Sequence, residues 1–168
     1  GTAYGTLGSV VVTYSGDVLG GFYPGDPNTT QVDGSGVNYW ASSSPPPYND
    51  PAYNAYAGVP NMPTDSDIIA LSSGIGVNTV TFSQPVKDPT MLILSIGYPG
   101  WVLRWDFDQP FTILSSGTGY WGGSPAGSLW KEPGDVLAAN EGHGALRFNG
   151  TFTSISWTAD PEWWSGFT

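Results

Sequence analysis

Short stretches with bulky apolar residues at every second position run along most of this chain, and each predicts a strand with one face in a core. The clearest is 101–107, where Trp, Leu, Trp and Phe alternate with other residues. Further strands are predicted at 7–14, 37–40, 68–71, 79–83, 91–96, 111–114 and 136–139. The stretch 91–96 is almost continuously apolar, as in a strand covered on both faces. Turn residues separate the stretches about every ten residues, and no window has the period of an amphipathic helix.

The segment 141–167 is the centre of the predicted fold, because it combines the only histidine with a long alternating apolar run. The parity of that run changes after 153–154, separating Leu146, Phe148 and Phe152 from Ile155 and Trp157. We predict one central antiparallel strand here, entered through a glycine-flanked turn at 142–144 and left at 160–161. The change of parity predicts a β-bulge or a tight corner within it.

The overall pattern predicts an all-β domain spanning 1–168. Residues 24–66 are dense in Pro, Gly and Tyr, and we expect a long loop there, pinned by its aromatic side chains. Each alternating strand must hide one face, so two antiparallel sheets packed as a jelly-roll-like β-sandwich are the first expectation. A closed β-barrel is the alternative.

Composition and charge narrow the classes of partner. The aromatic content of 14% argues against disorder. Four basic residues against fourteen acidic ones give a net charge of −10, which disfavours binding to nucleic acid or anionic lipid. No apolar run is long enough for membrane insertion. The acidic and lysine-poor composition, rich in Thr, Ser and Asn, suits a secreted protein in the extracellular space or at a cell surface, whereas the absence of cysteine leaves the redox compartment undecided.

Few residues could carry catalysis. Without cysteine and with a single histidine, thiol catalysis and a multi-histidine metal site are excluded, and a serine triad lacks its glycine-flanked elbow. Glu141 lies two residues before His143, and a glycoside-active enzyme using Glu141 and a second acid is one hypothesis. The competing interpretation is structural, with Glu141 and His143 capping a turn.

Calcium is the cofactor that the loop acids would suit, because hard cations take carboxylate and carbonyl oxygens. Asp65 and Asp67 stand just before a predicted strand and are the candidate ligands. The alternative is that both residues form solvated turns.

Aromatic residues in predicted loops are candidates for a sugar-binding platform. Flat aromatic faces flanked by hydrogen-bonding groups suit a carbohydrate. The pair Trp163–Trp164 also falls in a predicted loop, but the main candidates are Tyr39, Trp40, Tyr120, Trp121 and Trp130. Packing in the core is the alternative for each of them.

Self-association is a further hypothesis. The β-branched run Val10, Val11 and Val12 could pair with a neighbouring chain, since an open sheet edge offers unpaired backbone groups.

Several sequence blocks together resemble a known group of proteins. These blocks are 66–71, 78–86, 106–111, 114–122, 141–157 and 162–168. They resemble the ectodomains of exported bacterial proteins that often end in a PEP-CTERM sorting signal, although Trp164-Ser165 replaces a common Trp-His pair. The resemblance implies export, a β-sandwich and a surface or matrix setting, and it brings no assigned catalytic residues.

Three functions are therefore weighed. The first is a non-catalytic extracellular structural or adhesion module that self-assembles by strand pairing near its termini. The second is a carbohydrate-binding module that uses loop aromatics, with or without calcium, and a surface glycan as its partner. The third is the glycoside-active enzyme.

Overall fold

The computed structural model describes residues 1–18, 38–40, 54–64, 67–72, 76–122 and 128–168. One sheet of the described chain contains β1 (Thr2–Leu7), β2 (Val10–Ser15), β4 (Val77–Lys87), β6 (Leu103–Phe107), β8 (Leu129–Glu132), β9 (Val136–Ala139) and β11 (Thr151–Ala159). The other contains β3 (Ile69–Leu71), β5 (Thr90–Ile96), β7 (Phe111–Ser116), β10 (Gly142–Phe148) and β12 (Ser165–Phe167).

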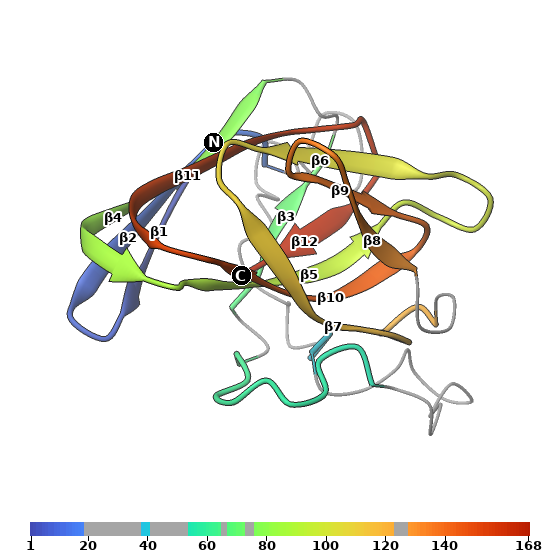
Figure 1. Cartoon of the computed structure of the whole chain (residues 1–168), viewed down its shortest axis with the longest axis horizontal. Helices are drawn as coiled ribbons and strands as arrows, with labels where there is room; N and C mark the ends of the chain where they lie inside the picture. The colour runs from blue at the N-terminus through green and yellow to red at the C-terminus, as the bar shows by residue number, and fades with distance from the viewer. Residues whose placement is uncertain (19–37, 41–53, 65–66, 73–75, 123–127) are drawn as a thin grey trace.

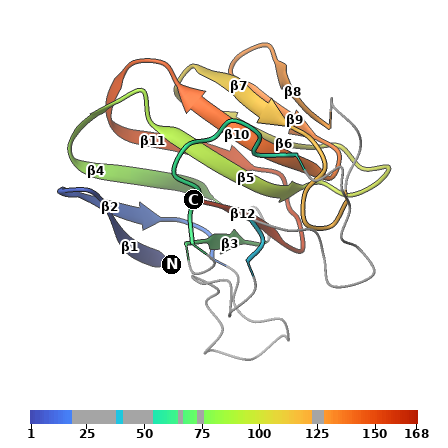
Figure 2. The ribbon, with the colours of Figure 1, turned by 90° about the horizontal axis from the view of Figure 1, so that it is seen from below.

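The two sheets lie face to face as a sandwich (Figure 1, Figure 2). The seven-stranded sheet has the order β1-β2-β4-β11-β6-β9-β8, and the five-stranded sheet the order β3-β12-β5-β10-β7. All pairings between the named strands are antiparallel. The prediction of a two-sheet antiparallel β-sandwich is confirmed, and the alternative of a closed barrel is wrong because, among the described strands, each sheet ends in two different edge strands and does not close on itself. No described helix is long and apolar enough to cross a membrane.

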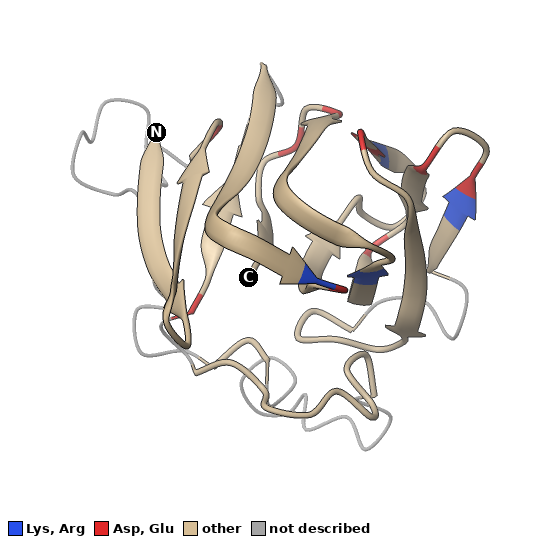
Figure 3. Cartoon of the chain, turned by 60° about the vertical axis from the view of Figure 1, so that its left-hand side comes forward, with Lys and Arg blue, Asp and Glu red and all other residues tan. Residues whose placement is uncertain are grey.

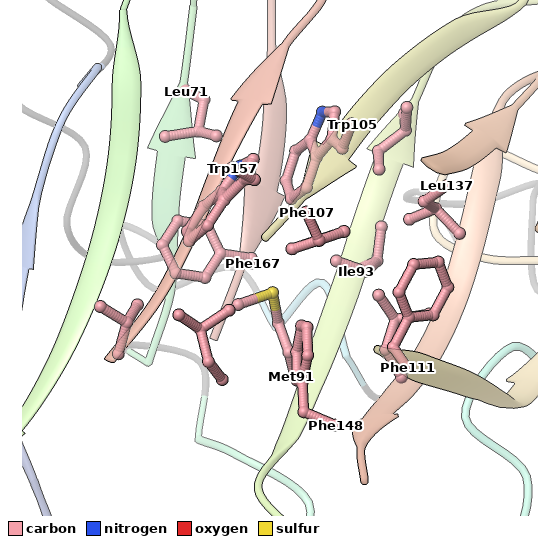
Figure 4. Packing of buried hydrophobic residues seen from close by; sticks show 14 of the residues in the cluster. Leu71, Met91, Ile93, Trp105, Phe107, Phe111, Leu137, Phe148, Trp157 and Phe167 are labelled. Atoms are coloured by element: carbon pink, nitrogen blue, oxygen red, sulfur yellow. The ribbon is translucent and has the colours of Figure 1, made fainter. Parts of the chain in front are cut away.

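The core between the sheets is built from aromatic side chains, as the alternation at 101–107 and 155–157 predicts (Figure 4). Trp105 and Trp157 stack with ring centroids 5.7 Å apart, and Phe167 meets Trp157 edge-on at 5.1 Å. Phe107 contacts Phe148 of the facing sheet at 5.1 Å. Burying each such side chain contributes about 2 kcal/mol, so this layer holds the two sheets together.

A second cluster covers the outer face of the five-stranded sheet. Leu92 and Leu94 of β5 point outward, where Trp40, Tyr56 and Tyr120 pack over them. The Tyr56 hydroxyl also donates a hydrogen bond of 2.7 Å to the carbonyl of Ile93. Both faces of β5 are therefore buried, as its continuous apolar sequence predicts. The predicted loop at 24–66 falls mostly outside the described residues; its described parts contain turns and supply this cover.

Four details of the predicted strands are corrected. The strand at 7–14 is two strands, because Gly8 and Ser9 form a tight turn in which Gly8 has a φ of 61°. Residues 38–40 form a turn and no strand. The strand predicted at 79–83 is longer, because it begins at Val77 and continues past Pro85 to Lys87. Strands β8 and β12 were not predicted, because both are short and lack clear alternation.

The single strand predicted within 141–167 is also wrong. Asn149 and Gly150 form a corner that carries the chain from β10 in one sheet to β11 in the other. The predicted bulge is present, since the register of β11 against β4 shifts between Phe152 and Ser154. The interruption of the ladder spans Phe82–Pro85 on the β4 side, which lets Pro85 sit in the strand without blocking a ladder hydrogen bond.

Candidate functional site

Several loops meet at one end of the five-stranded sheet, and we call this region the loop end. The last residues of β5 and β7 lie beside the first residues of β10, because Ile96 pairs with Gly142 and Ser116 with Gly144. Strand β12 runs antiparallel to β5 and so begins at the same end. The loop end therefore collects 97–102, 117–122, 140–141 and 160–164.

A buried polar cluster lies under the loop end. His143 is fully buried on β10, and its Nδ1 accepts a 3.2 Å hydrogen bond from the backbone N–H of Ser95. An accepting Nδ1 carries no proton, which places the ring proton on Nε2. Nε2 lies 3.2 Å from Oε1 of Glu141, and the same oxygen accepts a 2.7 Å hydrogen bond from the Ser95 hydroxyl. Ser95 therefore bonds to both partners, whereas the Nε2–Oε1 approach lacks hydrogen-bond geometry and leaves Nε2 buried without a hydrogen-bond partner among the described residues.

Two members of this cluster adopt unusual backbone conformations. Ser95 has a φ of 57° and Glu141 a φ of 50°, both in the left-handed region that non-glycine residues rarely occupy. Each such residue costs about 1–2 kcal/mol. Their side chains hydrogen-bond each other directly, so the strained backbones are what bring the hydroxyl and the carboxylate together.

A second carboxyl group approaches the cluster from the loop 160–164. Glu162 accepts a hydrogen bond from the backbone N–H of Gly97, and its Oε2 is buried with no hydrogen-bond partner among the described residues. Burial raises the pKa of Glu162 to about 8, and the nearby charge of Glu141 adds to this effect. The loop end therefore holds a carboxyl group that is largely protonated at neutral pH.

Glycines allow close packing around His143. A Cβ on Gly119 would lie 2.2 Å from the imidazole Cγ, so only glycine lets this turn rest on the ring. Gly142 and Gly144 lie inside β10 and not in the turn we predicted. Both positions need glycine, because a Cβ on Gly142 would collide with Ala139 and a Cβ on Gly144 with the Ser115 carbonyl. The turn itself is at Asn140 and Glu141. The glycines flanking His143 are thus packing residues.

An aromatic cluster, here called the ring cluster, lies at the same end above Gly119. Tyr39 stacks on Trp121 at 5.3 Å, and Trp164 meets Trp121 edge-on at 4.8 Å. Tyr120 contacts both Tyr39 and Trp121 and is almost fully buried. Trp121 remains 42% exposed and is the most accessible of these rings. The structure therefore brings together three of the five predicted platform residues and adds Trp164.

A second exposed aromatic pair was not predicted. Tyr98 and Trp101 are the first and last residues of the turn after β5, and their rings stack with centroids 5.7 Å apart. Tyr98 is 43% exposed and Trp101 is 61% exposed. The alternation at 101–107 assigned Trp101 to the core, and that assignment is wrong. The turn is held by the N–H of Gly100, which donates to the Asn140 side chain at 3.3 Å. Trp163, beside the carboxyl group of Glu162, is 92% exposed.

The other predicted site residues lie elsewhere. Trp40 is buried as a member of the second cluster, over the outer face of the five-stranded sheet. Trp130 lies on β8, where its indole N–H donates to Glu132 at 3.4 Å, and it takes no part in the ring contacts of the ring cluster among the described residues. Val12 pairs with both β1 and β4, and the N–H of Val11 donates to the Ser83 hydroxyl, so the run 10–12 is already paired in its own sheet.

Only one of the two predicted calcium ligands lies among the described residues. Asp65 is outside the described residues, and the carboxylate of Asp67 accepts hydrogen bonds from the N–H and the hydroxyl of Thr64 at 3.0 and 2.9 Å. Across the described ranges, no three His, Asp or Glu side chains group in a way that could hold a metal ion.

An apolar cleft of about 380 Å³ opens at the opposite edge of the sandwich, under the β1–β2 hairpin. Its lining is mainly inner-face core residues, including Phe82, Met91 and Phe148. Of its titratable groups, Asp67 is bonded to Thr64 and the Tyr14 hydroxyl donates to Asn78. A ligand site needs convergent polar groups, so the loop end is the better candidate.

In the comparisons with known proteins, no protein-family model, curated protein or solved structure matches this chain.

Proposed function

We propose that this chain is a non-catalytic extracellular adhesion module that binds a glycan at the loop end. The observation that carries the proposal is the ring cluster, in which the half-exposed Trp121 is braced by Tyr39 and Trp164. Exposed tryptophan on a rigid support is rare without a binding role, because its apolar area could otherwise be buried.

The chemistry around the ring cluster suits a sugar. The C–H face of a pyranose stacks on an indole, while hydroxyl groups need hydrogen-bonding partners beside it. The loop end supplies such a group in the half-buried side chain of Asn140, which borders the turn of Tyr98 and Trp101. The second aromatic pair, Tyr98 and Trp101, offers another stacking surface on a neighbouring loop. A net charge of −10 favours neutral glycans over anionic ones.

The secreted location belongs to the same proposal. The acidic and lysine-poor composition supports it, and so does the resemblance to exported bacterial ectodomains. Adhesion to a surface glycan is the role that a small binding domain would have in such a setting.

Binding to a panel of neutral polysaccharides, measured by affinity electrophoresis, tests the proposal. Trp121→Ala should weaken binding at least about tenfold, because exposed aromatic anchors dominate such contacts. Trp130→Ala is the matched control and should bind like the wild type, since Trp130 lies on β8 away from the ring cluster. Absence of binding by the wild type, or equal binding by Trp121→Ala, would reject the proposal.

One observation favours a glycoside-active enzyme as the second candidate. Glu162, with its pKa raised to about 8, could donate a proton to a glycosidic oxygen while Glu141 acts as the second carboxyl group. Binding ranks first because Glu141 is 8% exposed and already accepts the Ser95 hydroxyl. Release of reducing sugar that Glu162→Gln and Glu141→Gln both abolish would favour catalysis over binding.

A further inference from the structure

Within the described part of the chain the two sheets end in four edge strands, and these differ in how much backbone they offer to another chain. Strand β3 has only three residues. Strand β8 is tied to the edge of the facing sheet, because Lys131 donates to the Phe111 carbonyl of β7 at 2.9 Å and lies over the Phe111 ring. Strand β8 also carries Glu132, which is ion-paired with Arg104. Strand β1 has six residues and none of these features.

Charge, proline and shortness are what usually protect an edge strand from pairing with another chain. The first sixteen residues contain no Asp, Glu, Lys, Arg or Pro, although the chain as a whole carries a net charge of −10. The β1–β2 hairpin, beside the label N in Figure 3, is accordingly tan, without the blue or red of charged residues. Two copies of an acidic chain repel each other least where neither carries carboxylates, and β1 is such a surface.

The hydrogen-bonding pattern of the hairpin defines which groups of β1 are open. Gly1 and Gly16 exchange both of their backbone hydrogen bonds. Bonded and non-bonded pairs alternate along an antiparallel ladder, so Ala3, Gly5 and Leu7 bond inward to β2. The N–H and C=O groups of the intervening residues therefore point to the open edge. These residues are Thr2, Tyr4 and Thr6.

This set of open groups is symmetric about Tyr4, and that symmetry identifies the occupant. A second copy of β1, running antiparallel about a two-fold axis, sets Tyr4 opposite Tyr4 and Thr2 opposite Thr6. All three residues of each strand then pair at once. Centring the axis on Gly5 would leave Thr2 opposite Gly8, beyond the end of the strand, and would lose that pair.

We propose that β1 is a dimerisation edge, at which two copies of this chain pair through Thr2, Tyr4 and Thr6 and join their seven-stranded sheets into one continuous sheet. The exposed side chains support this arrangement. Tyr4 is 78% exposed, and on the same face of β2 Val11 is 48% exposed. In the dimer the two Tyr4 rings lie side by side on this face, as cross-strand aromatic neighbours do. The inference does not depend on glycan binding.

Disulfide trapping tests the register directly, because the chain contains no cysteine. In Tyr4→Cys the two Cα atoms would be about 5.5 Å apart, within disulfide range. Thr2→Cys and Thr6→Cys are matched controls on the same exposed face, but their symmetry mates would be about 13 Å apart, four residues along the strand. Under mild oxidation we expect Tyr4→Cys to form a covalent dimer at least about tenfold faster than either control. Equal rates in all three variants would overturn the proposal.

Sedimentation of the cysteine-free protein over a wide range of concentration gives an independent test. The wild type should pass from monomer to dimer by mass action. Tyr4→Pro removes the outward N–H without touching a hairpin bond, as proline is tolerated at an open edge. Tyr4→Thr keeps the N–H and removes only the ring. We expect Tyr4→Pro to weaken the dimer at least about tenfold relative to Tyr4→Thr, and Trp121→Ala to leave it unchanged. A wild type that stays monomeric throughout, or equal dimerisation by the two Tyr4 variants, would contradict the inference.

Discussion

The loop end and the β1 edge are the two regions of the sandwich at which we propose binding, and they differ in the groups that they offer to a partner. The loop end concentrates side-chain chemistry, namely the buried Ser95, Glu141 and His143, the raised pKa of Glu162 and the ring cluster. The β1 edge offers only main-chain groups and uncharged side chains. Recognition at the loop end therefore depends on which side chains are present, whereas recognition at the edge depends on the course of the backbone.

The two regions also differ in what their residues contribute to the fold. At the loop end, strained backbones and buried polar groups support one another, so removing one member leaves another unpaired. At the edge, the outward groups of β1 are hydrated and their loss costs the monomer little. We expect substitutions at the loop end to change stability and substitutions at the edge to change association.

The dependence of stability on pH should distinguish the regions most strongly. Glu162 titrates near 8 in the folded chain and near 4.5 when unfolded, so the folded state binds the extra proton between these values. The stability that this group contributes is complete below about pH 4.5 and is lost as pH rises to about 8, with a slope of at most about 1.4 kcal/mol per pH unit. Over the roughly 3.5 pH units between these values the total fall is at most about 5 kcal/mol, which urea unfolding at several pH values should show.

Glu162→Gln isolates that contribution, since the amide imitates the protonated acid. The variant should be more stable than the wild type at pH 8 and similar to it at pH 4.5. Glu132→Gln is the control, because the ion pair and hydrogen bond with Arg104 lower the pKa of Glu132 and its contribution is lost as pH falls. An alkaline fall that persists in Glu162→Gln would assign the pH dependence to another group.

Removing the buried imidazole should have the next largest effect. His143→Leu keeps most of the volume but leaves the N–H of Ser95 without its acceptor and takes the ring from Glu141. An unsatisfied buried donor and a carboxylate without its neighbour together cost about 2–4 kcal/mol in the free energy of unfolding. Tyr4→Thr at the β1 edge is the comparison and should cost less than about 0.5 kcal/mol. Similar losses in the two variants would show that the loop end is no more tightly coupled than the edge.

Much of the sandwich could be predicted from alternation alone, because strands such as β4, β6 and β7 each show their pattern locally. The corner at Asn149 and Gly150 could not. Leu146 and Phe148 before it share their parity with Phe152 after it, so the pattern passes through a change of sheet without a visible break. The change of parity after 153–154 did predict the true bulge between Phe152 and Ser154.

Only two of the four residues of the candidate site could be predicted from the sequence, again because only local patterns can be read there. Glu141 and His143 are two residues apart, and a strand places such residues close together. Ser95 and Glu162 join them only through the register of β5 with β10 and the return of the chain to β12, which no local pattern contains. The Tyr98–Trp101 pair had a signal that was missed, since a Pro-Gly turn with an aromatic residue at each end predicts cross-turn stacking.

A matched pair of glycine substitutions gives the finest comparison of the two regions. A Cβ on Gly119 would lie 2.2 Å from the His143 ring, whereas a Cβ on Gly5 of β1 would meet nothing within 4 Å. Gly119→Ala must displace the imidazole and should lower the free energy of unfolding by about 1–3 kcal/mol. Gly5→Ala should stay within about 0.5 kcal/mol of the wild type, because alanine also restricts the unfolded chain. Chemical denaturation of both variants measures the difference. If Gly119→Ala is as harmless as Gly5→Ala, the imidazole is free to move, and the loop end is not the rigid support that glycan binding requires.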